Sequence, residues 1–295
     1  MTKSGACLRR LLGIRLGVLA QHKPRPIAVA TAHDVPRPAG SPELPSFTIV
    51  TPSLNQGNVI SETVVSVIAQ KYPRLQYLIQ DGGSRDDTLE KLRPYESQVD
   101  LRIERDSGQA DALNRAFRRA SGDIFAYLNS DDILLPGALM TVATYFIQHP
   151  EVDVIYGNRL LIDANGQQIG EWDLPYHDGE LLKQVDYIPQ ETAFWRRSAW
   201  EKAGGHFNQS LHFALDWEFF LRLQAAGARF AHIPKFLGAF RVHSEQKTQS
   251  SFRGRGVSEM RELRRQYGGT SATARIAQHV RHVSFLARHI LLRTH

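Results

Sequence analysis

The stretch Phe125-Ala126-Tyr127-Leu128-Asn129-Ser130-Asp131-Asp132 decides the fold of this chain. Its first four residues are apolar or aromatic, which predicts a buried strand, and the strand stops at two adjacent carboxylates. Open α/β sheets bind ligands at the carboxyl ends of their strands, so the functional site is expected here. Neighbouring carboxylates repel unless a cation or a dense set of donors shares them, which favours a divalent metal ion. The alternative is that Asp132 caps the helix predicted from Pro136 onward.

On the N-terminal side of this stretch, strand and helix patterns alternate. The predicted strands cover residues 47–51, 75–80, 101–104 and 123–128, and the predicted helices cover residues 58–70 and 109–120. Such alternation predicts parallel strands joined by right-handed crossovers.

On the C-terminal side, the alternation gives way to a mixed sheet. The predicted helices cover residues 137–148, 198–203 and 215–226, and the predicted strands cover residues 152–162, 168–172, 190–195, 229–233 and 236–242. Asn165-Gly166 favours a tight hairpin turn between the first two of these strands. The fold class is therefore α/β, with a Rossmann-like mixed central sheet flanked by helices.

The charge of the chain is unevenly distributed. The net charge is +6, yet the first 33 residues hold six basic and no acidic side chains, and residues 251–295 hold nine basic and two acidic ones. The middle of the chain is therefore net negative. A nucleic-acid enzyme usually carries positive charge on its working domain, so the basic tails do not indicate nucleic acid. The single cysteine, Cys7, can form no intrachain disulfide, which favours a reducing, cytoplasmic location.

Residues 1–45 are expected to be a basic, proline-rich tail and linker. Residues 8–20 are apolar apart from three arginines and are too short to span a bilayer. This segment is interpreted either as amphipathic and lying on a membrane surface, or as a disordered tail. Six prolines between residues 24 and 45 indicate a linker that cannot be helical.

Residues 251–295 are expected to be a basic, amphipathic helical extension. Apolar side chains recur there at three- and four-residue spacing, at Ile276, Val280, Val283, Ala287 and Ile290. This stripe either packs on the domain or on a partner helix, or it holds the chain on an anionic membrane surface at the cytoplasmic face.

Three motifs in order resemble family 2 glycosyltransferases of the GT-A fold. They are Thr51-Pro-Ser-Leu-Asn-Gln with Asp81-Gly-Gly-Ser-Arg-Asp-Asp-Thr, then Asn129-Ser-Asp-Asp, then Ala214-Leu-Asp-Trp-Glu-Phe-Phe. The resemblance covers residues 46–250. It implies a nucleotide-diphosphate-sugar donor, a divalent metal (Mg²⁺ or Mn²⁺) and inversion at the anomeric carbon. The acceptor it implies is a hydroxyl of a glycan or a lipid-linked molecule, in cell-surface polysaccharide synthesis.

The resemblance places Asn129, Ser130 and Asp131 at the Asp-x-Asp position of the family, with Asn129 in place of the first acid. Asp131 and Asp132 would then bind the metal, or one of them the ribose. His243 matches an Arg-x-His pattern whose histidine can face the metal and diphosphate; a purely structural histidine is the alternative.

Asp216 matches the general base of the family, which would deprotonate the acceptor hydroxyl. The family commonly has Glu-Asp where this chain has Leu215-Asp216, so only the second acid is kept. A helix cap is the alternative role for Asp216. Glu218 is the substitute base.

Asp81 matches an acid that lies near the nucleotide base, but Gly82 stands where many relatives have a second acid, so the choice of base is left open. The resemblance places five further side chains on the donor side, namely Ser53, Asn55, Asp106, Gln109 and Asn114. It places Gln190, Thr192 and Trp195 on the acceptor side, where Trp195 either stacks on a sugar or belongs to the core.

Two other classes of function are weighed. A catalytically silent nucleotide-sugar or glycan-binding module is argued only by the missing acids at Gly82, Asn129 and Leu215. A nucleotidyltransferase would be expected to carry a glycine-rich, basic loop after the first strand, and residues 51–58 contain no Lys or Arg. We therefore expect a glycosyltransferase.

Overall fold

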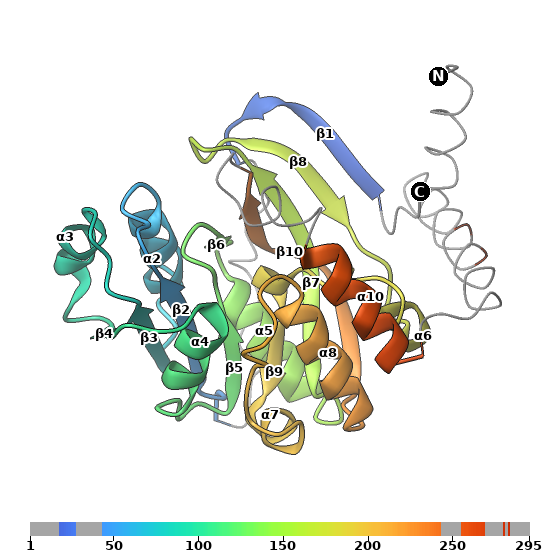
Figure 1. Cartoon of the computed structure of the whole chain (residues 1–295). Helices are drawn as coiled ribbons and strands as arrows, with labels where there is room; N and C mark the ends of the chain where they lie inside the picture. The colour runs from blue at the N-terminus through green and yellow to red at the C-terminus, as the bar shows by residue number, and fades with distance from the viewer. Residues whose placement is uncertain (1–17, 28–42, 243–254, 269–279, 281–282, 284–295) are drawn as a thin grey trace, which may run out of the picture.

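A computed structural model describes residues 18–27, 43–242 and 255–268, together with residues 280 and 283 (Figure 1). Ten strands form one mixed sheet, in the order β1-β8-β7-β9-β5-β2-β3-β4, and β10 pairs with β6 and β7. Helices cover both faces of this sheet. The predicted fold class, α/β with a mixed central sheet, is confirmed.

The N-terminal half contains the parallel part of the sheet. Its elements are β2 (Phe47–Ser53), α2 (Ile60–Ile68), β3 (Leu75–Asp81), α3 (Thr88–Leu92), η2 (Arg93–Tyr95), β4 (Asp100–Ile103), α4 (Gln109–Phe117) and β5 (Ile124–Tyr127). β2 pairs in parallel with both β3 and β5, and β3 pairs in parallel with β4. The alternation predicted from the sequence is confirmed, and it brings the carboxyl ends of β2, β3 and β5 to one edge.

The C-terminal half completes the sheet and covers it. Its elements are β6 (Ile133–Leu134), α5 (Ala138–Gln148), β7 (Val154–Ile162), β8 (Gln168–Asp173), α6 (Gly179–Leu182), η3 (Gln190–Thr192), β9 (Phe194–Arg196), α7 (Arg197–Lys202), α8 (Leu215–Ala225), β10 (Phe230–Arg241) and α10 (Val257–Gln266). β7 and β8 form the predicted hairpin, in which Gly166 takes φ 73°. β9 joins the two halves because it pairs antiparallel with β5 and β7.

Two expectations for this half need correction. Residues 190–192 form a 3₁₀ turn instead of a strand, because Thr192 bonds its hydroxyl to the carbonyls of Gly157 and Pro189 at 3.1 and 2.9 Å. The last two predicted strands form the single strand β10, whose pairing with β7 shifts register after Ile233.

The core divides into two layers, one on each face of the sheet. Alternate residues of the central strands point to opposite layers: Ile124 and Ala126 to one, Phe125 and Tyr127 to the other. α4 and α8 pack on the layer that contains Tyr127, and α2 and α5 pack on the other. Burial on both faces is what the continuous apolar runs of these strands predict.

The first described residues correct the predicted tail. Val18–Arg25 forms strand β1, which pairs antiparallel with β8 along the outer edge of the sheet (Figure 1). The prolines Pro24 and Pro26 lie at the end of this strand, where an edge strand tolerates them. Residues 8–17 of the basic segment lie outside the described part of the chain.

Helix α10 packs on the domain. Leu263 is buried in the core, and Met260 and Tyr267 lie against it. The apolar stripe of residues 276–290 lies outside the described residues, except for Val280 and Val283, which are exposed. Within the part of the chain that the structure describes, no helix is both long and apolar enough to cross a bilayer.

Candidate active site

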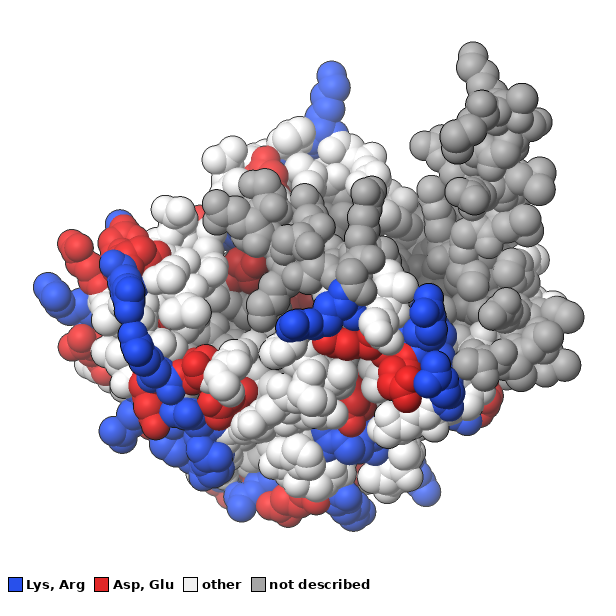
Figure 2. All heavy atoms as spheres, in the orientation of Figure 1, with Lys and Arg blue, Asp and Glu red and all other residues white. Residues whose placement is uncertain are grey.

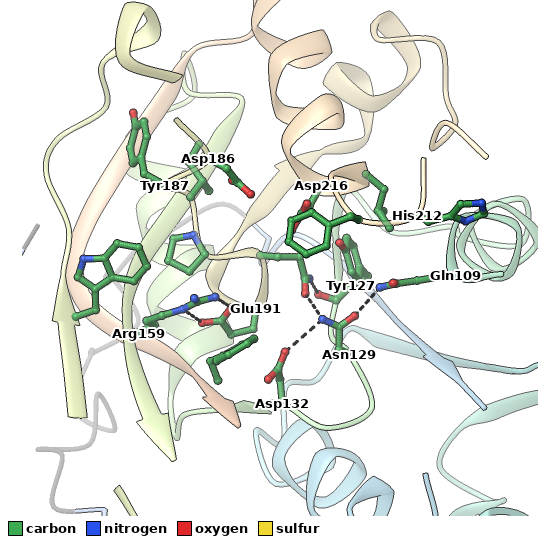
Figure 3. Close-up of a pocket in the computed structure, with 17 residues that line it drawn as sticks. Gln109, Tyr127, Asn129, Asp132, Arg159, Asp186, Tyr187, Glu191, His212 and Asp216 are labelled. Carbon is green, nitrogen blue, oxygen red and sulfur yellow. Dashed lines mark hydrogen bonds and ion pairs between the residues drawn. The ribbon is translucent and has the colours of Figure 1, made fainter. Parts of the chain in front are cut away.

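A cavity of ≈ 280 Å³ opens at the carboxyl end of β5 (Figure 3). Its walls come from β5 and the turn after it, from β7, β8 and β10, and from two loops before η3 and α8. The lining residues are Gln109, Tyr127, Asn129, Asp132, Arg159, Trp172, Asp186, Tyr187, Ile188, Pro189, Gln190, Glu191, His212, Phe213, Leu215, Asp216 and Phe240. The cavity therefore lies at the carboxyl end of the strand after which the sequence predicts the functional site.

Asn129 is the centre of a hydrogen-bond network in this cavity. Its amide nitrogen donates to Gln190 Oε1 at 3.1 Å and to Asp132 Oδ2 at 3.3 Å, and its oxygen accepts from Gln109 Nε2 at 2.8 Å (Figure 3). Gln190 in turn donates to the carbonyl of Tyr127. An aspartate at position 129 could only accept, so the amide joins groups that a carboxylate would repel or leave unpaired.

Asp132 is almost fully buried, with 1% of its surface exposed. Burial raises the pKa of its carboxyl well above the ordinary value, and the charges of Asp131 and Glu191 raise it further. One carboxylate oxygen accepts a hydrogen bond from the backbone N–H of Arg241 at 3.1 Å. A cation bound here would relieve the cost of keeping this carboxylate ionised.

The turn that holds these acids is fixed by the side chain of Arg241, which is fully buried. Its guanidinium donates to the carbonyl of Asp131 at 2.9 Å, to the carbonyls of Asp163 and Ala164, and to the carboxylate of Glu62 at 2.6 Å. One side chain therefore ties β10, α2 and the β7–β8 hairpin to the turn after β5.

The donor set fits a divalent metal that is shared with a ligand. Among the described residues, no group of three or more His, Cys, Asp and Glu side chains is arranged to hold a metal ion alone. Mg²⁺ and Mn²⁺ are commonly bound by one or two carboxylates together with substrate phosphate oxygens and water. Asp132 lines the cavity and offers one such carboxylate, and Asp131 is the residue before it. His243, the third predicted ligand, lies outside the described residues.

A buried ion pair forms another wall of the cavity. Arg159 bonds both carboxylate oxygens of Glu191, with Nε to Oε1 at 2.7 Å, and Glu191 is 2% exposed. The Arg159 guanidinium also lies over the rings of Phe240 and Trp172, at 4.6 and 5.6 Å from their centroids. The pair places a positive and a negative group beside Asp132 and Asp216: the charge of Arg159 lowers the pKa of each carboxyl, and the charge of Glu191 raises it.

Asp216 and Asp186 lie together on the side of the cavity opposite Asp132 (Figure 3). Burial raises the pKa of both carboxyls, and the charge of Asp216 adds to the shift at Asp186. The positive charge of Arg159 opposes both shifts. Asp216 is the second residue of α8 and accepts a hydrogen bond from the N–H of Trp217 at 2.9 Å.

Glu218 does not line this cavity. It is 5% exposed, and its carboxylate bonds Arg222 Nε at 2.9 Å and Nη2 at 3.2 Å. Glu218, the substitute base predicted from the sequence, therefore forms an ion pair with Arg222 outside the cavity, whereas Asp216 lines the cavity.

Four of the predicted donor-side residues lie around the turn after β3, namely Ser53, Asn55, Asp81 and Asp106. Asp81 is fully buried and accepts from the N–H groups of Gly83 and Ser84 and from the Ser84 hydroxyl at 2.9, 2.7 and 2.7 Å. Asn55 accepts from Arg85 N–H at 2.9 Å, and its own N–H donates to the Ser84 hydroxyl. The Ser53 hydroxyl is buried and has no hydrogen-bond partner among the described residues. It is a polar group that a ligand could satisfy.

Asp106 lies against Gly82. A Cβ atom built on Gly82 would be 2.7 Å from Asp106 Oδ2, and the other oxygen of Asp106 accepts from Gly108 N–H at 2.9 Å. Burial raises the pKa of Asp106, with the charge of Asp81 among the smaller causes. Gly82 has no carboxylate of its own, and the carboxylate of Asp106, from the loop after β4, occupies the space beside it.

Three residues that were predicted to belong to the site pack in the core or bond the backbone, and they do not line the cavity. Trp195 is fully buried among Phe117, Trp200 and Phe219, so the core alternative describes it and it does not face an acceptor. Thr192 is fully buried in the 3₁₀ turn described above. Asn114 uses its amide on the backbone of Phe207, at 2.7 and 2.9 Å. Gln190 and Gln109, by contrast, line the cavity.

No pattern in the sequence pointed to three of the lining residues, Arg159, Asp186 and Glu191. Arg159 lies inside a predicted strand and Asp186 in a loop without a periodic pattern, so neither gave a local signal. Glu191 is next to Gln190, which the resemblance had already placed on the acceptor side.

Solved structures with similar folds are glycosyltransferases. TarS of S. aureus (residues 1–349, with UDP-GlcNAc) has a TM-score of 0.61 at 18% identity, covering 83% of this chain and 72% of that one. The mannosyltransferase PcManGT of Pyrobaculum calidifontis, with GDP-Man and Mn²⁺, has a TM-score of 0.56 at 18% identity, covering 99% and 88%. The fold is therefore that of GT-A glycosyltransferases.

Sequence comparison gives the family. The model of Glycosyl transferase family 2 matches residues 48–207, and the chain belongs to this family. A PGL/p-HBAD biosynthesis glycosyltransferase of Mycobacterium tuberculosis is 28% identical over 197 residues, 64% of this chain and 75% of that protein. The chondroitin synthase of Escherichia coli is 29% identical over 206 residues, 68% of this chain but 30% of that protein. The predicted family and enzyme class are confirmed.

The contact between Gly82 and Asp106 can be measured by a double-mutant cycle. We expect Gly82→Ala to lower the free energy of unfolding by about 1–3 kcal/mol, because the new methyl group displaces the Asp106 carboxylate. In an Asp106→Ala background the same change should be neutral or slightly stabilising, since the displaced group is gone and alanine restricts the unfolded chain. Urea denaturation of the four proteins gives the coupling. An equal cost in both backgrounds would contradict the contact.

Proposed function

We propose that this glycosyltransferase moves a sugar from a nucleotide-diphosphate donor to an acceptor hydroxyl with inversion, in glycan synthesis. The observation that carries the proposal is one cavity with the Asp132 carboxylate at the end of β5 on one side and the Asp216 carboxylate on the other. The solved neighbours bound to UDP-GlcNAc and GDP-Man support the donor class.

Asp131 and Asp132 would hold the divalent metal, which when bound neutralises negative charge on the diphosphate leaving group. The neighbour bound to Mn²⁺ supports this assignment. Ser53, Asn55, Asp81 and Asp106, with the ordered turn at Gly83, would form the end of the site that receives the nucleoside.

Asp216 acts as the general base in the proposed reaction. Its carboxylate takes the proton of the acceptor hydroxyl while that oxygen bonds to the anomeric carbon and the carbon–oxygen bond to the diphosphate breaks. The nucleoside diphosphate leaves with the bonding electrons. Asp186, on the same wall, offers carboxylate oxygens to a further acceptor hydroxyl, and the positive charge of Arg159 opposes the rise in pKa that burial causes at both carboxyls.

A catalytically silent binding module is the alternative, and the surroundings of the three substituted positions weigh against it. Asn129 joins Gln109, Gln190 and Asp132, Gly82 makes room for Asp106, and Leu215 is followed by Asp216 in the cavity wall. A decayed site would not be expected to replace lost acids with matched partners.

We also propose a glycan or lipid-linked acceptor, presented at the cytoplasmic face of a membrane. The support is the sequence of the two tails, whose basic amphipathic segments suit an anionic surface. Figure 2 shows that charges of both signs are interspersed over the visible face of the described domain, so its surface adds no single basic patch to this support.

The donor and base assignments are tested together. A nucleotide sugar with Mn²⁺ should raise the melting temperature of the wild-type chain, since a ligand at about 100 times its Kd adds about 2.7 kcal/mol. Asp132→Asn should lose the metal-dependent part of this shift. Asp216→Asn should keep the shift but lower turnover by about a hundredfold or more.

Asp186→Asn is the matched control on the same wall. At saturating acceptor its turnover should fall by less than about tenfold, because the proposed base remains. Near wild-type transfer by Asp216→Asn would contradict the assignment of Asp216 as the base. The absence of a metal-dependent shift with every nucleotide diphosphate tested would count against the donor class.

The pH profile of kcat/KM should depend on the two charges beside Asp216. Asp216 must be ionised to accept a proton, so activity falls as the pH drops through its raised pKa. Arg159→Gln removes a positive charge that lowers this pKa, and the acidic limb should move to higher pH. Glu191→Gln removes a negative charge that raises it, and the limb should move to lower pH. Shifts in the same direction would contradict the assignment of this limb to Asp216.

Liposome flotation tests membrane association. The full chain should float with anionic vesicles at low salt and not at high salt, since each basic side chain near the surface contributes about 1 kcal/mol. Arg281→Glu combined with Arg288→Glu should abolish flotation. The same charge change at the exposed Arg261 and Arg265 of α10 should weaken it less. Equal effects of the two double variants would remove the C-terminal stripe from the proposal.

A further inference from the structure

Helix α10 reaches the cavity through one carboxylate. Glu259 Oε1 accepts from the backbone N–H of His212 at 3.1 Å, and Oε2 accepts from Phe213 and Ala214 N–H at 2.9 and 3.0 Å. His212 and Phe213 line the cavity, and Ala214 is the N-cap residue of α8. The backbone donors of the N-cap residue and of the two residues before it are thus satisfied by a carboxylate from another helix.

The remaining contacts hold α10 in a fixed place on the domain. Arg264 Nε donates to the carbonyl of Gln184 at 2.7 Å, and its guanidinium lies 5.4 Å from the ring centroid of Trp217. Gly256 sits against the ring of Phe213, and a Cβ there would be 2.9 Å from it. The helix therefore contacts the loop that carries Asp186, because Gln184 lies two residues before it, and also the loop that leads into α8 and Asp216.

Helix α4 holds the first residues of the loop 207–214, whose last residues are bonded by Glu259. The amide of Asn114 bonds the backbone of Phe207 on both sides, and Gln209 Nε2 donates to Asp111 Oδ1 at 3.3 Å. Residues 207–214 are thus suspended between α4, whose Gln109 bonds Asn129, and α10. The position of the loop depends on both anchors.

We propose that Glu259 is a positioning residue for the acceptor side of the cavity. Its hydrogen bonds fix the position of the backbone of residues 212–214. This backbone in turn positions the ring of Phe213 and the first turn of α8, which carries Asp216. This inference rests on the proposed function, in which Asp216 receives the acceptor proton. α10 lies beyond residues 48–207, the part that matches the family, so the acceptor wall of this chain is completed by a segment outside that part.

Glu259→Ala is the test, and Glu262→Ala is its matched control. Glu262 is on the same helix but points to solvent, where its side chain is 63% exposed and pairs with Arg265. We expect Glu259→Ala to speed hydrogen exchange of the amides of residues 212–214 by about tenfold or more, since charge-assisted bonds are lost. At a temperature well below melting, its acceptor KM should rise or its kcat fall by about tenfold. The donor KM should stay within about twofold. Glu262→Ala should change none of these.

The outcomes separate the inference from the function on which it rests. Unchanged exchange at residues 212–214 would overturn the anchoring role itself. Faster exchange and a lower melting temperature with unchanged acceptor kinetics would show a merely structural role and overturn the positioning role. Glu259→Gln, which keeps the shape and one acceptor oxygen, should fall between wild type and alanine in both measurements. If the wild-type chain transfers no sugar at all, the proposed function fails, while the exchange data still decide whether Glu259 anchors the loop.

Discussion

The site depends on the burial of a single guanidinium, that of Arg241. A buried arginine is costly unless its donors are satisfied, and here they are directed to three carbonyl oxygens and one carboxylate. Two of those carbonyls belong to the β7–β8 hairpin, and one belongs to Asp131 itself. The backbone N–H of the same arginine bonds Asp132. One buried cation therefore holds the backbone of the turn that carries the two acids.

A second feature of the site is that its carboxylates come from unexpected segments. Gly82 lacks an acid, and Asp106 occupies the adjacent space. Leu215 lacks one, and Asp186 lies across the same wall from Asp216. At both positions the motif residue has no carboxylate, and a loop that the fold brings close to it carries one. The charge near a ligand depends on where carboxylates lie in the folded chain, and residues from different parts of the sequence can place a carboxylate at the same point.

The parallel half of the fold could be read from the sequence because its signals are local. Apolar runs such as 123–128 and helical spacing such as 58–70 predict elements without knowledge of their neighbours. The cavity walls could not be read in this way. Asp186 becomes notable only when Asp216 lies beside it, and Trp195 is a core residue only because helices α7 and α8 close over it. The 3₁₀ turn at residues 190–192 reflects a hydroxyl that bonds carbonyls distant in sequence.

Strand β1 bears on the integrity of the sheet as a whole. It pairs with β8 through residues that precede the part matched by the family, so without it β8 would expose a row of unpaired backbone N–H and C=O groups. Such an open border is a template for pairing with another chain. β1 ends in Lys23, Pro24 and Arg25, side chains that discourage further pairing along its own outer side. The segment that the sequence predicts to be a tail and linker thus covers an edge of the sheet, and a chain trimmed to the part matched by the family would be expected to self-associate along the exposed β8.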